Sequence, residues 1–231
     1  MQATSESAAW EATIRVPEVQ FESARSALLV IDLQYLTASR DHGLFKRLRE
    51  TGMAEGIDYA IGRIERTVVP AVARLTAAYR SAGLPVIYAR CASVRGDGSD
   101  QTSRHRAQGL ICTVASKEAQ ILEEIAPQDG DLVLTKSGSG CFTSTALDHT
   151  LRNMGVTTLT VCGIWTNSCV ETTVRHAGDL DYSVVVVEDA CVAMTPTLHR
   201  NALEYLDNNF CTVRSTAELL ETLPSSESEA A

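Results

Sequence analysis

The sequence lacks several features that would place the protein in a membrane, secreted or zinc-binding class. No segment approaches the run of about eighteen apolar residues that a membrane-spanning helix needs. The N-terminal segment has no basic flank followed by an apolar stretch, so we expect no signal peptide. The seven cysteines form neither a CxxC pair nor a Cys/His group with the spacing of zinc ligands. We therefore expect a protein of the reducing cytoplasm, without a metal or other cofactor.

Positive charge is scarce as well. Lys and Arg number 20 against 29 Asp and Glu, which gives a formal net charge of −9. A surface of that sign repels phosphate backbones and anionic lipids, so neither nucleic acid nor a membrane is an expected partner. The length of 231 residues, with 45% hydrophobic and 21% charged residues, is typical of one globular domain. These observations leave the chemistry of the protein open.

Short apolar runs rich in Val, Ile and Leu alternate with segments of helical periodicity. This pattern predicts an α/β fold of three layers, in which helices cover both faces of a doubly wound, mainly parallel sheet of about six strands. Gly83, Gly155 and Gly178 stand where three of the helices would end. The expected strands are 27–32, 85–90, 131–136, 157–163, 182–188 and 211–214. The expected helices are 61–82, 117–125, 144–154, 168–180, 197–208 and 216–223.

We expect one domain over 25–224, preceded by a loose arm over 1–24 and followed by a disordered tail over 225–231. Two long, weakly periodic stretches, 34–56 and 92–110, are expected to be lids or binding loops. In an open α/β sheet the ligand site lies outside the carboxyl ends of the strands. Residues at those ends are therefore the candidates for chemistry.

Three candidate residues lie at such ends. Asp32 ends the first predicted strand, Lys136 ends the third, and Cys169 begins the helix that follows the fourth. Taken singly, each has an ordinary structural interpretation: a carboxylate that caps a turn, a solvated ammonium, and a buried thiol. Taken together they can form a catalytic group. Asp32 can accept the thiol proton and later deliver it to a leaving nitrogen, while Lys136 holds positive charge near both.

The segment GIWTNSCVETT places Cys169 in a first helical turn. Ser168 and Glu171 have the spacing of a capping box, and apolar residues of helical period follow them. Unpaired N–H groups and the positive end of the helix dipole favour a thiolate, so we expect a lowered pKa for Cys169. The backbone N–H groups of Trp165 and Cys169 are expected to form an oxyanion hole.

These motifs resemble those of the isochorismatase-like cysteine hydrolase superfamily. That superfamily includes ureidoacrylate amidohydrolases, N-carbamoylsarcosine amidohydrolases, biuret hydrolases and nicotinamidases. The resemblance extends over 26–223 and rests on three motifs in order. They are Asp32 with Gln34, Lys136 followed by Phe142 and Thr145, and GIWTNSCVETT.

The resemblance implies that Cys169, Asp32 and Lys136 form a catalytic triad and that water resolves a thioester intermediate. It also implies a cis peptide bond between Ile164 and Trp165, which would aim the Trp165 N–H into the oxyanion hole. A homodimer or homotetramer is a further implication of the resemblance.

Two departures from relatives narrow the expected function. Nicotinamidases carry an Asp-x-His metal motif, and the sequence upstream of Arg90 has none, so no bound zinc is expected. Isochorismatases that hydrolyse a vinyl ether often lack the cysteine, whereas this sequence keeps Cys169. We therefore expect hydrolysis of a C–N bond in a small amide or ureide. Two alternatives stay open: vinyl-ether hydrolysis of the isochorismatase type, and a non-catalytic module whose cysteine senses oxidation.

The predicted substrate-binding residues are Gln34, Tyr35, Arg90, Phe142 and Asn167. If the family geometry holds, aromatic rings surround the thiol and the two amides orient the substrate. Arginine binds carboxylates through parallel hydrogen bonds, so the basic loop after the second strand makes an anionic ureido acid one hypothesis. A solvated loop or a subunit contact explains the same residues equally well. The basic residues of this region are Arg90, Arg95, Arg104, His105 and Arg106.

Overall fold

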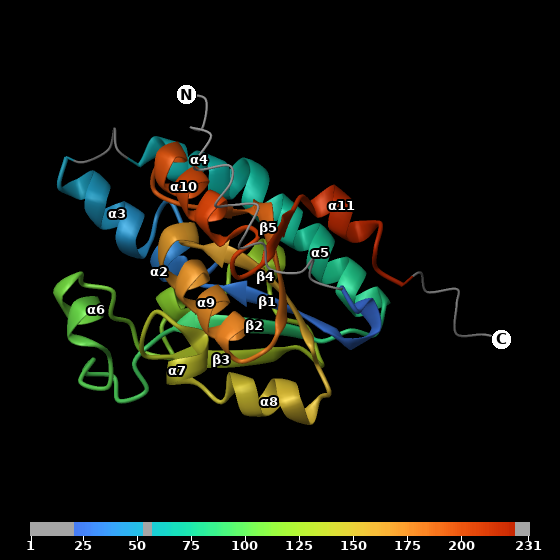
Figure 1. The fold of residues 1–231 in the computed structure, drawn as a ribbon. Helices are drawn as coiled ribbons and strands as arrows, with labels where there is room; N and C mark the ends of the chain where they lie inside the picture. The colour runs from blue at the N-terminus through green and yellow to red at the C-terminus, as the bar shows by residue number, and fades with distance from the viewer. Residues whose placement is uncertain (1–20, 53–56, 225–231) are drawn as a thin grey trace.

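The computed structural model describes residues 21–52 and 57–224, which contain a six-stranded parallel sheet (Figure 1). The strand order is β3-β2-β1-β4-β5-β6, and helices cover both faces. The winding direction therefore reverses between β1 and β4. The predicted three-layer α/β fold is confirmed. The strands are Ser26–Ile31 (β1), Val86–Cys91 (β2), Leu132–Lys136 (β3), Thr158–Ile164 (β4), Ser183–Val192 (β5) and Thr212–Arg214 (β6).

The two central strands, β1 and β4, are buried along their whole length. Helices on both sides of the sheet exclude water from them, which is why they read as nearly continuous apolar runs. Five of the predicted strands differ from the observed ones by one residue or less at each end. The fifth strand, predicted to end at 188, instead continues to Val192. A register shift between β4 and β5, with the extra residues in β5, lets Cys191 and Val192 pair with Gly163 and Ile164, beyond the polar residues that made the strand seem to end.

The helices alternate with the strands. α5 and α11 lie on one side of the sheet, and α8 and α9 lie on the other (Figure 1). The α-helices are Tyr35–Ala38 (α2), Gly43–Glu50 (α3), Asp58–Arg63 (α4), Val69–Ser81 (α5), Ser103–Ala107 (α6), Cys141–Ser144 (α7), Leu147–Asn153 (α8), Glu171–Asp179 (α9), Pro196–Leu206 (α10) and Thr216–Leu220 (α11). Short 3-10 and π turns are Ser23–Arg25 (η1), Ile64–Val68 (η2), Lys117–Ala119 (η3), Glu123–Ile125 (η4) and Thr166–Val170 (η5).

The long helix predicted over 61–82 is present as α4, η2 and α5, which follow one another without a break. Pro70 lies at the start of α5. Proline has no N–H to donate to the preceding turn, and the π turn of η2 occurs directly before it.

The helix predicted over 117–125 is wrong. The structure has two 3-10 turns there, η3 and η4, separated by extended backbone at Gln120. The carbonyls of this segment accept hydrogen bonds from outside it: Glu118 O from the Gln34 side chain, and Ala119 O from Arg90. A bridge between Gln34 and Ile121 adds to these contacts. Tertiary hydrogen bonds therefore take the place of the helical ones.

The stretches 34–56 and 92–110, expected to be loops, contain three short helices where the structure describes them. These are α2 and α3 in the first stretch and α6 in the second. Helices of this length carry little periodic signal, and buried anchors such as Leu36, Phe45 and His105 hold them to the domain.

Two of the three predicted glycine helix ends are present. Gly83 and Gly155 follow α5 and α8 with φ of 65° and 68°, the left-handed conformation typical of a C-terminal cap. Gly178 instead lies inside α9, close to Phe210. The left-handed residue beyond α9 is Asp181.

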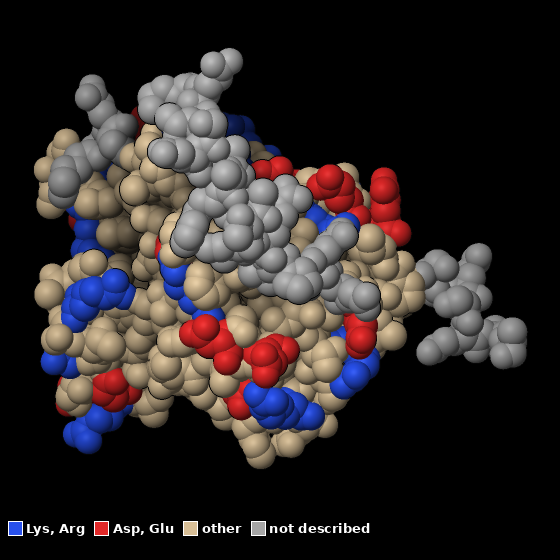
Figure 2. Space-filling model, in the orientation of Figure 1, with Lys and Arg blue, Asp and Glu red and all other residues tan. Residues whose placement is uncertain are grey.

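The surface carries charges of both signs. On the face drawn in Figure 2, acidic and basic side chains are scattered among uncharged ones. None of the helices in the described ranges is both long and apolar enough to cross a membrane. The predicted tail, 225–231, and most of the predicted arm, 1–24, lie outside the described residues.

Gly163 lies where β4 pairs with β1 opposite Ile31 and leaves no room for a side chain. A Cβ atom built on it would lie 2.1 Å from Ile31 O, and its φ is 117°. We predict that Gly163→Ala lowers the free energy of unfolding by about 3 kcal/mol or more, through backbone strain and overpacking. Chemical denaturation measures the change. Gly155→Ala is the control, because its φ is also positive but nothing lies within 4 Å of the added carbon, so about 1 kcal/mol is expected. Equal losses in both variants would contradict the role of the close approach.

Candidate active site

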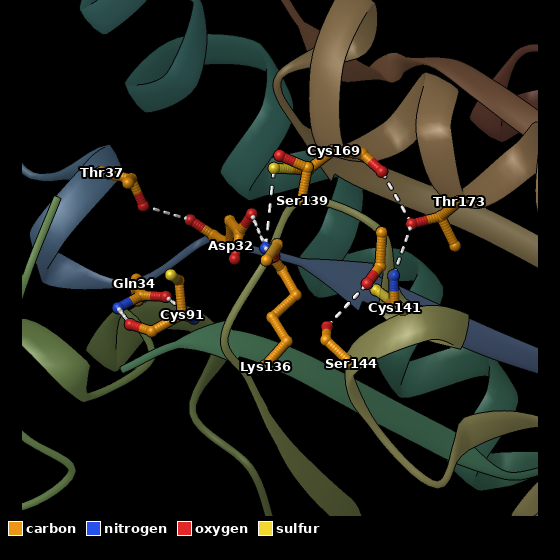
Figure 3. A network of polar contacts seen from close by, with 12 residues as sticks. Asp32, Gln34, Thr37, Cys91, Lys136, Ser139, Cys141, Ser144, Cys169 and Thr173 are labelled. Atoms are coloured by element: carbon orange, nitrogen blue, oxygen red, sulfur yellow. Dashed lines mark hydrogen bonds and ion pairs between the residues drawn. The ribbon is translucent and has the colours of Figure 1, made fainter. Parts of the chain in front are cut away.

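The structure brings Asp32, Lys136 and Cys169 together at the carboxyl edge of the sheet (Figure 3). The Lys136 Nζ atom lies 2.9 Å from Asp32 Oδ2 and 3.6 Å from Cys169 Sγ. It also donates to Gly138 O at 2.9 Å, so three acceptors surround the ammonium. All three side chains are buried. They come from β1, β3 and the turn after β4, segments far apart in the sequence.

The Asp32 backbone is held in an unusual conformation directly after β1. Its φ is 56°, in the left-handed region that few non-glycine residues adopt. Its N–H donates to Ala89 O at 2.8 Å, and its carbonyl accepts from Thr37 Oγ1 at 2.6 Å. These contacts stabilise the conformation and direct the carboxylate toward Lys136.

Cys169 is held by a chain of hydrogen bonds between two helices. Thr173 Oγ1 donates to Cys169 O at 2.7 Å and accepts from Cys141 N at 3.2 Å, which links η5 to α7 (Figure 3). The peptide bond between Ile164 and Trp165, just before η5, is cis.

The capping box predicted from Ser168 and Glu171 is not formed. The helical segment begins earlier, with Trp165 at its N-cap and no side chain capping it. The Glu171 carboxylate pairs instead with Arg175 at 2.7 Å. Cys169 is therefore the fourth residue of the helical segment, three positions later than the capping box implied.

The prediction of a lowered pKa for Cys169 is also wrong. Burial and the negative charge of Asp32 raise the pKa of the Cys169 thiol to about 12, although Lys136 opposes them. Burial disfavours the Lys136 ammonium, yet attraction by Asp32 and the neighbouring thiols raises its pKa overall. The resting group at neutral pH is therefore a neutral thiol beside a carboxylate–ammonium pair.

One oxygen of the carboxylate stays available. Asp32 Oδ2 pairs with Lys136, whereas Asp32 Oδ1 is buried and has no hydrogen-bond partner in the described part of the chain. A buried carboxylate oxygen that accepts no hydrogen bond can take up a proton. The arrangement can thus receive the thiol proton as the sulfur attacks a substrate.

A cavity of about 440 Å³ opens above the three residues. This volume suits a small organic substrate. Its polar and charged lining includes Asp32, Lys136, Cys169, Arg104, His105, Gln108 and Asn167. Its apolar lining includes Leu36, Leu44, Leu48, Leu110, Trp165, Met194 and Leu198.

Trp165, predicted to lie beside the thiol, and Asn167, predicted to orient the substrate, both line the cavity. The Trp165 ring packs edge-on against Phe45 of α3, with 5.9 Å between ring centroids. This contact ties the turn after β4 to a helix that lay within an expected loop.

The structure places Gln34 and Tyr35 outside the cavity lining. The Gln34 amide is fully buried and holds strands and loops together: its Nε2 donates to Cys91 O at 2.9 Å, and its Oε1 accepts from Cys91 N at 2.6 Å. Tyr35 faces another surface, where the Lys117 ammonium lies 3.8 Å from its ring centroid. Both positions are structural in this conformation.

Arg90 and Phe142 also lie away from the cavity lining. The Arg90 guanidinium donates to Thr135 Oγ1 and to Ala119 O, each at 3.2 Å. The Phe142 ring packs against Tyr182 with centroids 5.7 Å apart. Asn167 is therefore the member of the predicted substrate-binding set that meets the cavity.

Several lining residues could not be found from sequence motifs. Leu44 and Leu48 belong to α3 and Gln108 follows α6, in the two stretches expected to be loops, while Met194 and Leu198 reach the site from the α10 region. No motif marks these residues, and short helices carry little periodic signal of their own. Within the described residues, no group of three or more His, Cys, Asp or Glu side chains could hold a metal ion.

A doubly wound sheet with reactive side chains beneath a cavity at its carboxyl edge is the architecture of an enzyme. The isochorismatase domain model matches residues 26–218. The chain therefore belongs to the isochorismatase family of hydrolases, and the resemblance seen in its motifs is confirmed.

Comparisons with individual proteins agree with this family. The chain is 31% identical over 204 residues to the ureidoacrylate amidohydrolase RutB of Klebsiella pneumoniae, covering 81% of this chain and 82% of that protein. A cysteine hydrolase structure from Pseudomonas syringae superposes with a TM-score of 0.73 at 27% identity, covering 89% of this chain and 96% of that one. An N-carbamoylsarcosine amidase from Thermoplasma acidophilum gives 0.64 at 25% identity, covering 83% and 96%.

The Asp32–Lys136 pair should be strongly coupled. Lys136→Met removes the ammonium and leaves a buried carboxylate unpaired, so we predict a loss of about 3–5 kcal/mol in the free energy of unfolding. Adding Asp32→Asn removes the other charge. The double variant should therefore be more stable than the sum of the single losses implies, by about 1–3 kcal/mol. Urea unfolding of the four proteins measures this coupling, and strictly additive losses would contradict it.

Because Asp32 raises the pKa of Cys169, neutralising it should make the resting thiol easier to ionise. We predict that Asp32→Asn increases the rate at which iodoacetamide alkylates Cys169 at pH 8, although it removes the proposed proton acceptor. In the wild type, the rate should climb through pH 10 without a plateau, because a pKa of about 12 leaves the thiolate a minor species. Mass spectrometry of labelled peptides measures the extent of alkylation at Cys169. Slower alkylation in Asp32→Asn, or a plateau below pH 9, would contradict a neutral resting thiol.

Proposed function

We propose that the protein is a cysteine-dependent amidohydrolase that cleaves the C–N bond of a small linear amide or ureide. The observation that carries this proposal is the meeting of three buried groups at the base of the cavity. Lys136 Nζ contacts both Asp32 Oδ2 and Cys169 Sγ there. Relatives named as a ureidoacrylate amidohydrolase and an N-carbamoylsarcosine amidase support the substrate class.

In the proposed mechanism, Cys169 Sγ attacks the substrate carbonyl carbon while its proton moves to Asp32. Transfer during attack suits a thiol that is neutral at rest, because the sulfur becomes anionic only as the new bond forms. Lys136 stabilises the negative charge shared between sulfur and carboxylate. The Asp32 Oδ1 atom, which lacks a partner in the described residues, is the acceptor we assign to this proton.

The tetrahedral intermediate then loses its nitrogen. We assign the backbone N–H groups of Trp165 and Cys169 to the oxyanion, because the turn after β4 carries both to the cavity wall. The proton on Asp32 passes to the leaving nitrogen, which departs as ammonia or an amine. A water molecule, deprotonated by the same carboxylate, attacks the thioester and releases Cys169.

Asn167 is the polar residue we assign to substrate orientation, since it lines the cavity two residues before the thiol. The apolar walls exclude water from much of the site and leave room for a small, flat substrate. All seven cysteines are free thiols, which suits a reducing cytoplasm. A homo-oligomer stays a prediction from the family resemblance.

Loss of the thiol should abolish turnover. We predict that Cys169→Ala and Cys169→Ser reduce ammonia release by on the order of 10³-fold or more, across a panel of ureidoacrylate, N-carbamoylsarcosine, biuret, maleamate and nicotinamide. Cys211→Ala is the control, because it removes a buried thiol next to β6 that does not line the cavity. Full activity in Cys169→Ala would contradict the mechanism and favour an ether hydrolysis that needs no thiol.

A further inference from the structure

We propose that Arg104 binds a carboxylate of the substrate, so that the amide or ureide cleaved here is itself an acid. This inference rests on the proposed function, and it assigns one end of the substrate to a particular side chain. Arg104 belongs to α6 and lines the same cavity as Cys169.

The charges that line the cavity do not cancel. Asp32 and Lys136 form a buried pair and neutralise one another. Arg104 has no carboxylate within ion-pair distance among the described residues. Burial and the positive charge of Lys136 lower the pKa of His105, which keeps that ring neutral. The cavity thus holds one uncompensated positive charge in a protein whose formal charge is −9.

Hydrogen bonds attach Arg104 and its neighbours to the loop after β3. Arg104 Nη2 donates to Ser139 Oγ in the loop after β3. The next residue, His105, is buried, and its ring lies 3.4 Å from both Cys91 Sγ and Ser139 Oγ. Thr102, the N-cap of α6, donates its backbone N–H to Ser137 O at 3.1 Å. α6 is therefore attached to the loop that directly follows Lys136.

The other arginines of this region are engaged elsewhere. Arg90 bonds to Thr135 and Ala119 inside the fold. Arg95 pairs with Asp97, and Arg106 donates to Gln101 O. None of these three lines the cavity. The sequence made every arginine of this region a candidate for binding an anionic substrate. Of these arginines, Arg104 is the one that lines the cavity.

The position of Arg104 relative to the thiol defines a substrate with two ends. Cys169 is buried at the base of the cavity, whereas Arg104 is exposed at its wall. A carbonyl at the sulfur and a carboxylate at the guanidinium require one small molecule that carries both, such as a ureido acid, a carbamoyl amino acid or an amic acid.

Alkylation of Cys169 tests the inference without turnover. Iodoacetate and iodoacetamide transfer the same methylene carbon to sulfur with loss of iodide, but only iodoacetate carries a carboxylate. We expect Arg104→Gln to lower the ratio of the iodoacetate rate to the iodoacetamide rate by about tenfold. Arg95→Gln removes the same charge outside the cavity and should change that ratio by less than about twofold. The rate is taken as the labelling that disappears in Cys169→Ala.

Two results of this experiment would overturn the inference. An unchanged ratio in Arg104→Gln would show that the guanidinium does not meet the carboxylate. A fall in both rates by the same factor would show that Arg104 acts through Ser139 on the shape of the wall. Arg104→Lys keeps the charge without the planar fork, so an intermediate ratio is expected.

Hydrolysis provides a second measurement and separates this inference from the proposed function. With N-carbamoylsarcosine as substrate, Arg104→Gln should raise KM by about tenfold or more, and with its neutral amide KM should stay within about twofold. Equal effects on both substrates would overturn the assignment of Arg104 while leaving cysteine-dependent hydrolysis intact. Activity in Cys169→Ala would instead overturn the proposed function, whatever the alkylation ratio shows.

Discussion

The buried pair between Asp32 and Lys136 is the interaction on which the site depends. An ammonium with no exposure to solvent is tolerated only when acceptors surround it, and here a carboxylate, a backbone carbonyl and a thiol do so. The pair joins the ends of β1 and β3, with β2 between them in the sheet. The strand order therefore brings the two charges together, and the ammonium of the pair also contacts the Cys169 sulfur. Burial and the negative charge of Asp32 keep the Cys169 thiol neutral at rest, and Lys136 opposes both by lowering the thiol pKa.

A neutral resting thiol distinguishes this site from one built around a preformed thiolate. In papain-like ion pairs the sulfur is anionic before substrate arrives. Here burial disfavours the anion, and the proton acceptor that we propose is a carboxylate paired with Lys136. In the proposed mechanism the sulfur therefore ionises during the chemical step. Such a thiol is also less prone to adventitious oxidation, which follows thiolate character and exposure. This property fits a hydrolase better than a redox sensor.

Sequence reasoning predicted which side chains meet at the base of the cavity more reliably than which residues line its walls. Asp32, Lys136 and Cys169 stand at strand ends, where residue type and the rule for parallel sheets together point to a site. The motif of Gln34 was as clear as those of the three residues. Its amide nevertheless forms hydrogen bonds with the backbone N–H and carbonyl of Cys91. The same amide also bonds to Glu118 O, in the segment misread as a helix. Both errors have one cause, because a side chain from one loop satisfies the backbone of another and no local pattern reports such a contact.

The amino-acid sequence by itself determined the parallel α/β sheet, the location of its strands and the three side chains that meet at the carboxyl edge of the sheet. Buried strands and the helices between them leave strong periodic signals, and those signals are local. Only the tertiary structure decided which arginine meets the cavity, that Tyr35 and Phe142 face elsewhere, and that the Cys169 thiol has a raised pKa. These properties depend on distances between segments far apart in the chain and on how completely water is excluded. The spacing of residues along the sequence gives neither the distances between segments nor the extent to which water is excluded.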